Sequence, residues 1–151
     1  MDTQTAITIS HRVSELTQLV TGYQAQYGRY YKISADTPLT AVALQQAIFN
    51  KQVEVAELLD SDVRTKPGKR WLEWWRWQET LDIATCSELA RESNHLIACC
   101  AYHDAQPEGQ SSFAIHASQV TIAGMLHPDV CCTDFDLLEE IERVHEQMPD
   151  Y

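Results

Sequence analysis

The sequence Lys69-Arg-Trp-Leu-Glu-Trp-Trp-Arg-Trp77 holds all four tryptophans of this 151-residue chain within seven positions. Successive residues of a helix are turned by about 100°, which places the four tryptophans on one broad side and Glu73 and Arg76 on the other. The strict alternation of a strand would instead place Glu73 on the same face as Trp75. We therefore predict a helix over residues 69–84 with a buried aromatic side.

Basic residues surround this aromatic segment: five of the eleven Lys and Arg residues lie between Arg64 and Arg76. Cations interleaved with aromatic rings are typical of docking surfaces and of platforms for single-stranded nucleic acid. From the docking interpretation we expect Arg70, Trp74 and Trp77 to contact a partner. The alternative is that the tryptophans form the core of the chain itself.

Apolar residues recur at steps of four and three from residue 9 to residue 30, which is the spacing of a helical seam. This seam consists of Ile9, Val13, Leu16, Val20, Tyr23, Tyr27 and Tyr30. It predicts a helix capped by Ser10 that runs to about Tyr31, after a loose start over residues 1–8. We expect the helix to pack on its own domain; the alternative is a structural homo-oligomer through the residue 9–30 helix.

A second helical region is predicted after the dipeptide Thr37-Pro38, which is typical of a helix start. The apolar positions from Leu39 to Leu59 describe either one long helix or two helices separated near Asn50-Lys51. A capping-box spacing further along the chain predicts a short helix from Cys86 to Ser93, ended by Asn94.

At Leu96 the pattern changes to a continuous apolar run. The stretch Leu96-Ile-Ala-Cys-Cys-Ala-Tyr-His103 has the length of a strand that is covered on both faces. Apolar residues then alternate from Phe113 to Ile122, with a change of phase near Ser118-Gln119 that predicts a bulge or a turn between two strands. These patterns predict a small antiparallel sheet over residues 96–126.

The last helix is predicted to begin near Thr133 and to bury the stripe Leu137, Ile141, Val144 and Met148. Its other face is acidic, and like charges three or four residues apart repel by roughly 0.2–0.5 kcal/mol per pair. A face built at this cost is typical of a surface that meets a partner, and the alternative is a solvated face. We expect a basic partner to contact Asp136, Glu139, Glu140, Glu142 and Glu146.

The net charge of −11 is unevenly distributed along the sequence. Residues 1–76 contain nine Lys and Arg against eight Asp and Glu, whereas residues 77–151 contain two against fourteen, a net of −12. A strongly acidic surface repels nucleic acid and anionic membranes, and it attracts basic proteins. We therefore expect a basic or nucleic-acid-binding protein as partner, and no direct binding to nucleic acid or to a membrane.

Length and cysteine content indicate the class of protein. A chain of 151 residues is normally one domain, residues 1–151, with a core of its own. No apolar run approaches the ~20 residues of a membrane helix. Five cysteines, an odd number with two adjacent pairs, argue against a disulfide framework and indicate a reducing, cytoplasmic setting.

One set of residues has the composition of a zinc site. Cys100, His103, His127 and Cys131 would form a Cys2His2 set if a hairpin brought the two pairs together. In a strand, however, Cys100 and His103 point to opposite faces, and acidic surroundings raise the pKa of a cysteine that would act as nucleophile. We therefore expect no metal and no cofactor, with a metal-assisted or cysteine-dependent enzyme as the alternative.

Together these patterns predict one α+β domain: a helical N-terminal two thirds, a small antiparallel sheet and a closing acidic C-terminal helix. The predicted function is that of a small acidic protein-binding module of the inhibitor, immunity or adaptor type. One mechanism in this class is nucleic-acid mimicry, in which carboxylates about 6 Å apart on a helix replace phosphates. A homodimer is compatible with this prediction.

Overall fold

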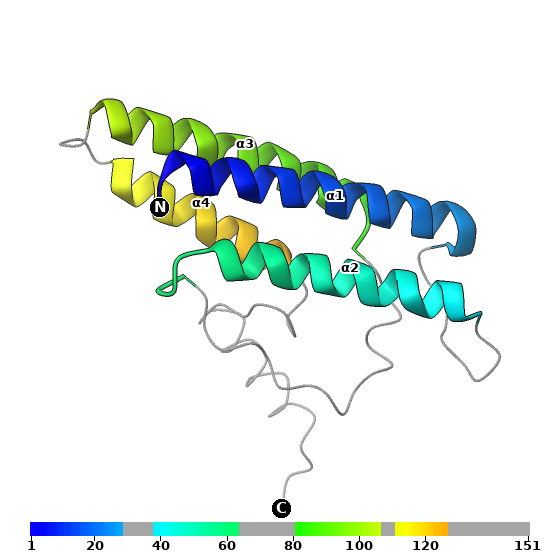
Figure 1. Cartoon of the computed structure of the whole chain (residues 1–151). Helices are drawn as coiled ribbons and strands as arrows, with labels where there is room; N and C mark the ends of the chain where they lie inside the picture. Colours follow the sequence, from blue (N-terminus) through cyan, green and yellow to red (C-terminus); the bar gives the residue numbers. More distant parts are fainter. Residues whose placement is uncertain (29–37, 64–80, 107–110, 127–151) are drawn as a thin grey trace, which may run out of the picture.

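The computed structural model describes residues 1–28, 38–63, 81–106 and 111–126, which fold into four helices (Figure 1). The helices are α1 (Thr3–Tyr27), α2 (Leu39–Leu58), α3 (Ile83–Ala105) and α4 (Ser111–Met125). No strand occurs within the described ranges. The predicted α+β class and its sheet over residues 96–126 are therefore wrong, because the end of α3 and all of α4 occupy that region. None of the described helices combines the length and hydropathy needed to cross a bilayer.

Helix α1 lies antiparallel to both α2 and α3, and α4 lies antiparallel to α3 (Figure 1). At one end of the bundle the Thr3 hydroxyl donates to the Asp104 carboxylate at 2.6 Å. At the other end the Gln24 amide donates to the Leu81 carbonyl at 2.7 Å. Helices α2 and α3 therefore point the same way, and Val63 and Leu81 lie toward opposite ends of the bundle.

Each helix contributes a seam of buried residues, spaced three and four positions apart, to a shared core. This spacing is typical of helices that pack side by side with interlocking side chains. The seams are Ala6, Ile9, Val13, Leu16, Val20 and Tyr23 in α1, Ala41, Gln45, Ile48, Gln52 and Val55 in α2, Cys86, Leu89, Ser93, Leu96 and Cys100 in α3, and Ile115, Gln119 and Ile122 in α4. The first seam does form a helix, but the helix ends at Tyr27 with Gly28 as its C-cap, and not near Tyr31. Its seam residues Ile9, Val13, Leu16, Val20 and Tyr23 are fully buried within one chain.

The first two helices differ from their predictions mainly at their ends. The Asp2 carboxylate accepts the backbone N–H of Thr5 at 2.7 Å and caps α1. Residues 3–8, predicted as a loose start, are therefore the first turns of the helix. Helix α2 begins directly after Pro38 and continues without a break through Asn50-Lys51, which decides for one long helix.

Helix α3 begins at a second aspartate cap. Asp82 has an extended backbone, and its carboxylate accepts the N–H of Thr85 at 2.6 Å. A single helix over residues 69–84 is therefore wrong at its C-terminal end, and the earlier part of that prediction lies outside the described residues. From this cap α3 continues through Asn94, the predicted end, to Ala105.

The strand prediction over residues 96–103 failed because its apolar run mixes buried and exposed positions. Leu96 and Cys100, four positions apart, are buried, whereas Ala98 and Ala101 are exposed. Alanine has the highest helix propensity, and its small side chain is tolerated on a helix surface. The apolar run thus forms a helix with one buried face and one exposed face, and small alanines occupy the exposed face.

The second strand prediction mistook part of a helical period for alternation. The change of phase near Ser118-Gln119 indicated a bulge, but both residues are buried next to each other on the inner side of α4. A period of 3.6 residues produces such adjacent buried pairs, which a strict period of two excludes. The change of phase at Ser118-Gln119 therefore indicated a helix and not a bulge between two strands.

Candidate functional site

The residues predicted to contact a partner lie outside the part of the chain that the structure describes. They are Arg70, Trp74, Trp77, Asp136, Glu139, Glu140, Glu142 and Glu146. His127 and Cys131 of the alternative zinc site lie outside it as well. Their expected roles therefore stay predictions.

Cys100 and His103 are placed on one helix, three residues apart, and not on opposite faces of a strand. Cys100 is only 1% exposed, and burial raises the pKa of its thiol. A thiol must lose its proton before it acts as a nucleophile or binds a metal, and burial opposes this loss. Within the described ranges, no three His, Cys, Asp or Glu side chains form a group that would hold a metal ion.

The other two described cysteines are also held in the protonated form. Burial is the main cause that raises the pKa of Cys86 to about 11, and a hydrogen bond with Thr17 offsets it only in part. Burial also raises the pKa of Cys99. None of these three thiols has the lowered pKa that an activated cysteine nucleophile requires.

Helices α1 and α4 begin, and α2 and α3 end, at the same end of the bundle (Figure 1), and five acidic residues belong to this end by their positions in the chain. We call this region the acidic end; it comprises Asp2, Glu57, Asp60, Asp62 and Asp104. The described residues include three Lys and Arg in total, and all three lie in the middle stretches of α1, α2 and α3. No described Lys or Arg belongs to the acidic end itself; the nearest positive charges are Arg12 and Lys51, which line a groove together with Glu57, and the Met1 ammonium group beside Asp60.

Two of these carboxylates lie at the ends of helices that they do not favour. Glu57 is in the last turn of α2, and Asp104 is in the last turn of α3. The C-terminal end of a helix carries partial negative charge, so each such carboxylate costs on the order of 0.3–1 kcal/mol. Asp2 occupies a favourable position, because hydrogen bonds from Thr5 lower the pKa of this N-cap. Asp60 and Asp104 have compensating contacts with the Met1 ammonium group and the Thr3 hydroxyl, so it is the helix positions of Glu57 and Asp104 that helix stability does not explain.

A cleft of about 220 Å³ opens at the acidic end. It is lined by Met1, Asp60, Asp62, His103, Ser112, Ile115, His116 and Gln119, which come from all four corners of this end of the bundle. The two aspartates have different environments: the Asp60 side chain is 42% exposed, whereas the Asp62 side chain is 74% exposed. Nδ1 of His116 lies 3.8 Å from Oδ2 of Asp62, so the pair attracts when the imidazole is protonated.

Gln119 fixes the inner carboxylate of the cleft. Its side chain is fully buried, accepts the backbone N–H of Asp60 at 2.8 Å and donates to Oδ2 of Asp60 at 2.8 Å. The N-terminal ammonium group of Met1 lies 3.7 Å from the same oxygen. Asp60 is thus held by α4 and by the chain terminus, while the more exposed Asp62 lies at the rim.

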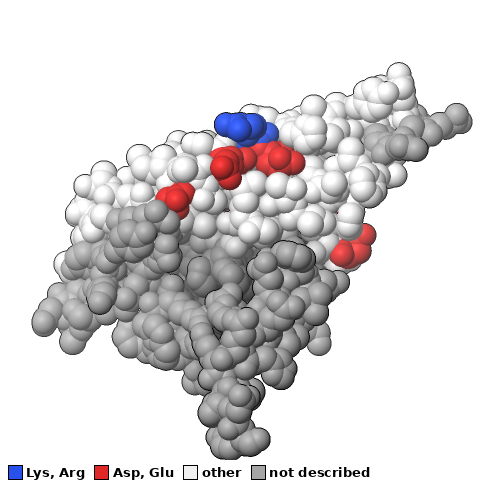
Figure 2. Space-filling view, turned by 180° about the vertical axis from the view of Figure 1, so that it is seen from behind, with Lys and Arg blue, Asp and Glu red and all other residues white. Residues whose placement is uncertain are grey.

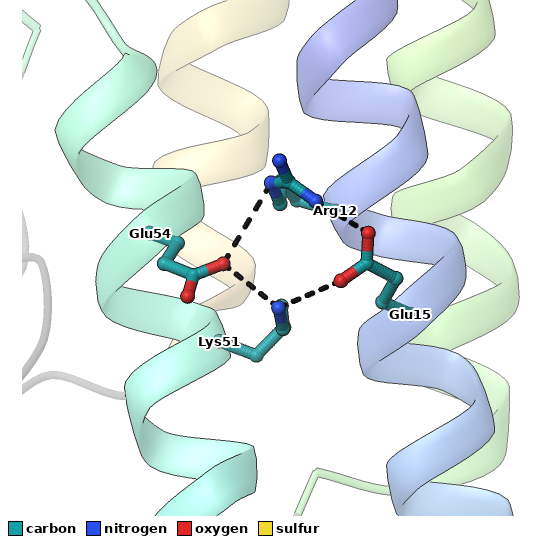
Figure 3. A network of polar contacts seen from close by, with 4 residues as sticks. All are labelled: Arg12, Glu15, Lys51 and Glu54. Carbon is teal, nitrogen blue, oxygen red and sulfur yellow. Dashed lines mark hydrogen bonds and ion pairs between the residues drawn. The ribbon is translucent and has the colours of Figure 1, made fainter.

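A second group of charges joins α1 to α2 along the side of the bundle (Figure 3). Nζ of Lys51 donates to Glu15 at 2.7 Å and to Glu54 at 2.8 Å, and Arg12 forms ion pairs with the same two carboxylates. The hydrogen bond with Lys51 is the main cause that lowers the pKa of Glu15, and it also raises the pKa of Lys51. The four charges cancel, so this network connects helices and contributes no net field.

The side-chain network borders an open groove of about 450 Å³. Thr8, Arg12, Lys51, Glu54, Glu57 and Leu58 line the groove. Because the cations are already paired with carboxylates, the groove offers no uncompensated positive charge. Figure 2 shows the opposite face of the molecule, where most of the described surface is uncharged and the central acidic groups lie beside a basic one.

The sequence did not predict the acidic end, because its residues are distributed over the chain from Asp2 to Asp104. The number of charged residues in the two halves of the sequence did not indicate the acidic end either. Among the described residues, positions 1–63 contain two Lys and Arg against six Asp and Glu, and positions 81–126 contain one against four. The only local signal was the absence of basic residues from the last turn of α2.

Comparison of the chain with protein-family models, with curated proteins and with solved structures finds no match. The geometry and chemistry of the described residues therefore carry the functional argument.

Proposed function

We propose that the protein is a small acidic protein-binding module that docks on a basic partner surface, as an inhibitor, immunity or adaptor protein does. The observation that supports this most directly is the acidic end, where five carboxylates gather without a described Lys or Arg. Charge complementarity accelerates encounter with a basic surface and excludes acidic ones. Carboxylates that replace phosphates in a nucleic-acid-binding groove are the specific form of docking that we propose.

The cleft provides this docking surface with a carboxylate whose orientation is fixed. Asp60 is held by Gln119, so its carboxylate is oriented before a partner arrives. Asp62 at the rim is available to a lysine or arginine side chain of the partner. A positioned carboxylate loses little conformational freedom on binding, which favours affinity.

Two observations favour docking over the alternatives. The seam that would form a homo-oligomer, from Ile9 to Tyr23, is already buried inside one chain by α2 and α3. The described cysteines have raised pKa values, which do not suit a cysteine-dependent enzyme. Cys86, Cys99 and Cys100 are free thiols, which supports a reducing cytoplasmic setting as part of the same proposal.

Affinity capture from the extract of the native host tests the proposal. Wild-type protein is compared with Asp62→Lys at the acidic end and with Glu88→Lys on the exposed side of α3, since both substitutions change the charge by the same amount. We expect the wild type and Glu88→Lys to retain the same protein at low salt and to release it as ionic strength rises. Asp62→Lys should retain at least several-fold less.

Equal capture by the two variants would contradict a docking role for the acidic end. Retention that does not change with salt would contradict a charge-driven partner. Circular dichroism and unfolding midpoints of both variants establish that any difference is not due to loss of fold.

A further inference from the structure

The outward face of α4 carries no charged residue, unlike those of the other helices. Helix α4 contains no Asp, Glu, Lys or Arg, whereas α1, α2 and α3 all do. Four of its exposed residues, Phe113, Ala117, Val120 and Gly124, follow each other at steps of four, three and four, and the exposed polar residues Ser112, His116 and Thr121 flank them. The Phe113 side chain is 76% exposed and Val120 is 37% exposed. Surface helices normally present polar residues to water, so this face is typical of a helix that another segment covers.

The chain itself contains a segment that fits this face. Twenty-five residues follow Leu126, and their sequence predicts a helix with the apolar stripe Leu137, Ile141, Val144 and Met148. This stripe has the same steps of four, three and four as the exposed stripe of α4. We propose that the C-terminal segment packs antiparallel on the outward face of α4, with Ile141 against Val120 and Val144 against Ala117.

Size and charge support this pairing. Ala117 and Gly124 leave room for the larger side chains of the C-terminal stripe, and a Cβ atom added at Gly124 would meet nothing within 4 Å. An uncharged face also avoids burying a charge beneath an acidic helix. Because the segment is covalently attached and its predicted stripe begins eleven positions after Leu126, its effective concentration at α4 is high.

The pairing has a consequence for the acidic residues of the C-terminal segment. If its apolar stripe faces α4, Glu139, Glu142 and Glu146 lie on the opposite side of the helix and point to solvent. The inference goes beyond the proposed function and does not depend on it, because it concerns the apolar face and not the partner.

Disulfide trapping in the full chain tests the pairing. Ala117→Cys is combined with Val144→Cys in a background in which Cys99, Cys131 and Cys132 are serine. We expect rapid intramolecular disulfide formation under mild oxidation, identified by mass spectrometry of the linked peptides. The control combines Ala117→Cys with Glu146→Cys, which lies two residues away along the chain but on the other side of the predicted helix, and it should react several-fold more slowly.

Two outcomes of the trapping experiment would overturn the inference. Equal yields from the two pairs, or no intramolecular product, would exclude the antiparallel pairing. A disulfide between two chains would place a second copy on α4 in place of the C-terminal segment.

Carbene footprinting of the chain without cysteine changes provides an independent measurement. Phe113 should be labelled several-fold less than Tyr102, although Tyr102 is less exposed on the described helices, at 56%. Ile141→Asp should restore labelling of Phe113. Labelling of Phe113 as strong as that of Tyr102, or no response to Ile141→Asp, would contradict the pairing.

Discussion

Gln119 is the residue that connects the core of the bundle to the acidic end. Its amide lies fully buried and uses both of its ends on Asp60, with donor and acceptor distances of 2.8 Å. Gln45 is a second buried glutamine, but its amide nitrogen alone forms a hydrogen bond, donating to Tyr23; its Oε1 has no hydrogen-bond partner among the described residues. The side-chain amide of Gln119 thus forms hydrogen bonds with both its oxygen and its nitrogen, whereas that of Gln45 forms one with its nitrogen alone.

This difference predicts unequal effects of the same substitution. Gln119→Leu removes two hydrogen bonds with Asp60, from its backbone N–H and to its carboxylate, and should lower the free energy of unfolding by about 0.5–1.5 kcal/mol for each. Gln45→Leu removes an unsatisfied oxygen together with one hydrogen bond, so its effect should be clearly smaller. Urea unfolding of both variants measures this, and equal losses would show that the contacts of Asp60 are not important for stability.

Asp82 gives a second prediction at this scale. Its carboxylate accepts the N–H of Thr85, so Asp82→Ala should lower the free energy of unfolding by about 1 kcal/mol. Glu88→Ala removes the same charge from the exposed surface of the same helix and should change stability much less. If the two variants have the same midpoint in thermal unfolding, Asp82 does not act as the cap.

At the scale of elements, the charge network between α1 and α2 should make stability depend on pH. The folded-state pKa of Glu15 lies below its ordinary value of 4.5, so its contribution is complete above that value and is lost as pH falls through the folded pKa. The pKa of Lys51 is raised above 10.5, so the contribution of the lysine persists up to strongly alkaline pH.

A double-mutant cycle measures this contribution directly. Glu15→Gln, Lys51→Met and the combined variant should show a favourable coupling free energy at pH 7 that decreases as the pH falls below 4.5 and the Glu15 carboxylate becomes protonated. The coupling should also decrease in high salt, because both side chains are partly exposed. A coupling that is the same at pH 3 and pH 7 would contradict an ion pair between these residues.

The C-terminal end of α2 gives a prediction of the opposite sign. Glu57→Gln removes a carboxylate from the negative end of the helix, so it should raise the free energy of unfolding by about 0.3–1 kcal/mol at low salt. Glu88→Gln, in the N-terminal half of α3, should not stabilise. A stabilised Glu57→Gln variant that binds its partner less well would indicate that function, and not stability, maintains the acidic end.

The sequence predicted α1 and α2 because large apolar residues recur there at steps of three and four. It predicted only residues 86–93 of α3 as a helix and none of α4, because their seams contain small and polar residues such as Cys86, Ser93, Ser118 and Gln119. Because α3 has exposed alanines and α4 has other exposed apolar residues, the sequence did not show which face of each helix is buried. The aspartate caps at Asp2 and Asp82 were visible in the sequence, but nearby Ser and Thr residues offered competing starts.

At the scale of the whole molecule, the direction of the helices creates the acidic end. Because α2 and α3 point the same way, their C-terminal ends meet beside the N-terminal ends of α1 and α4 (Figure 1). Residues as distant in sequence as Asp2, Asp60 and Asp104 thereby share one surface. Such a surface is not predictable from charge counts along the chain, because it depends on topology, and the topology depended on α3 and α4 being helices.

The most direct test of the account is hydrogen exchange of the chain alone and bound to the protein that it captures. The account predicts that binding slows exchange at the acidic end, in the last turns of α2 and α3, in residues 59–63 and in the first turn of α4. The middle stretches of α1 and α2 should be unchanged. Protection confined to those middle stretches, or absent from the acidic end, would contradict the claim that this end is the docking surface.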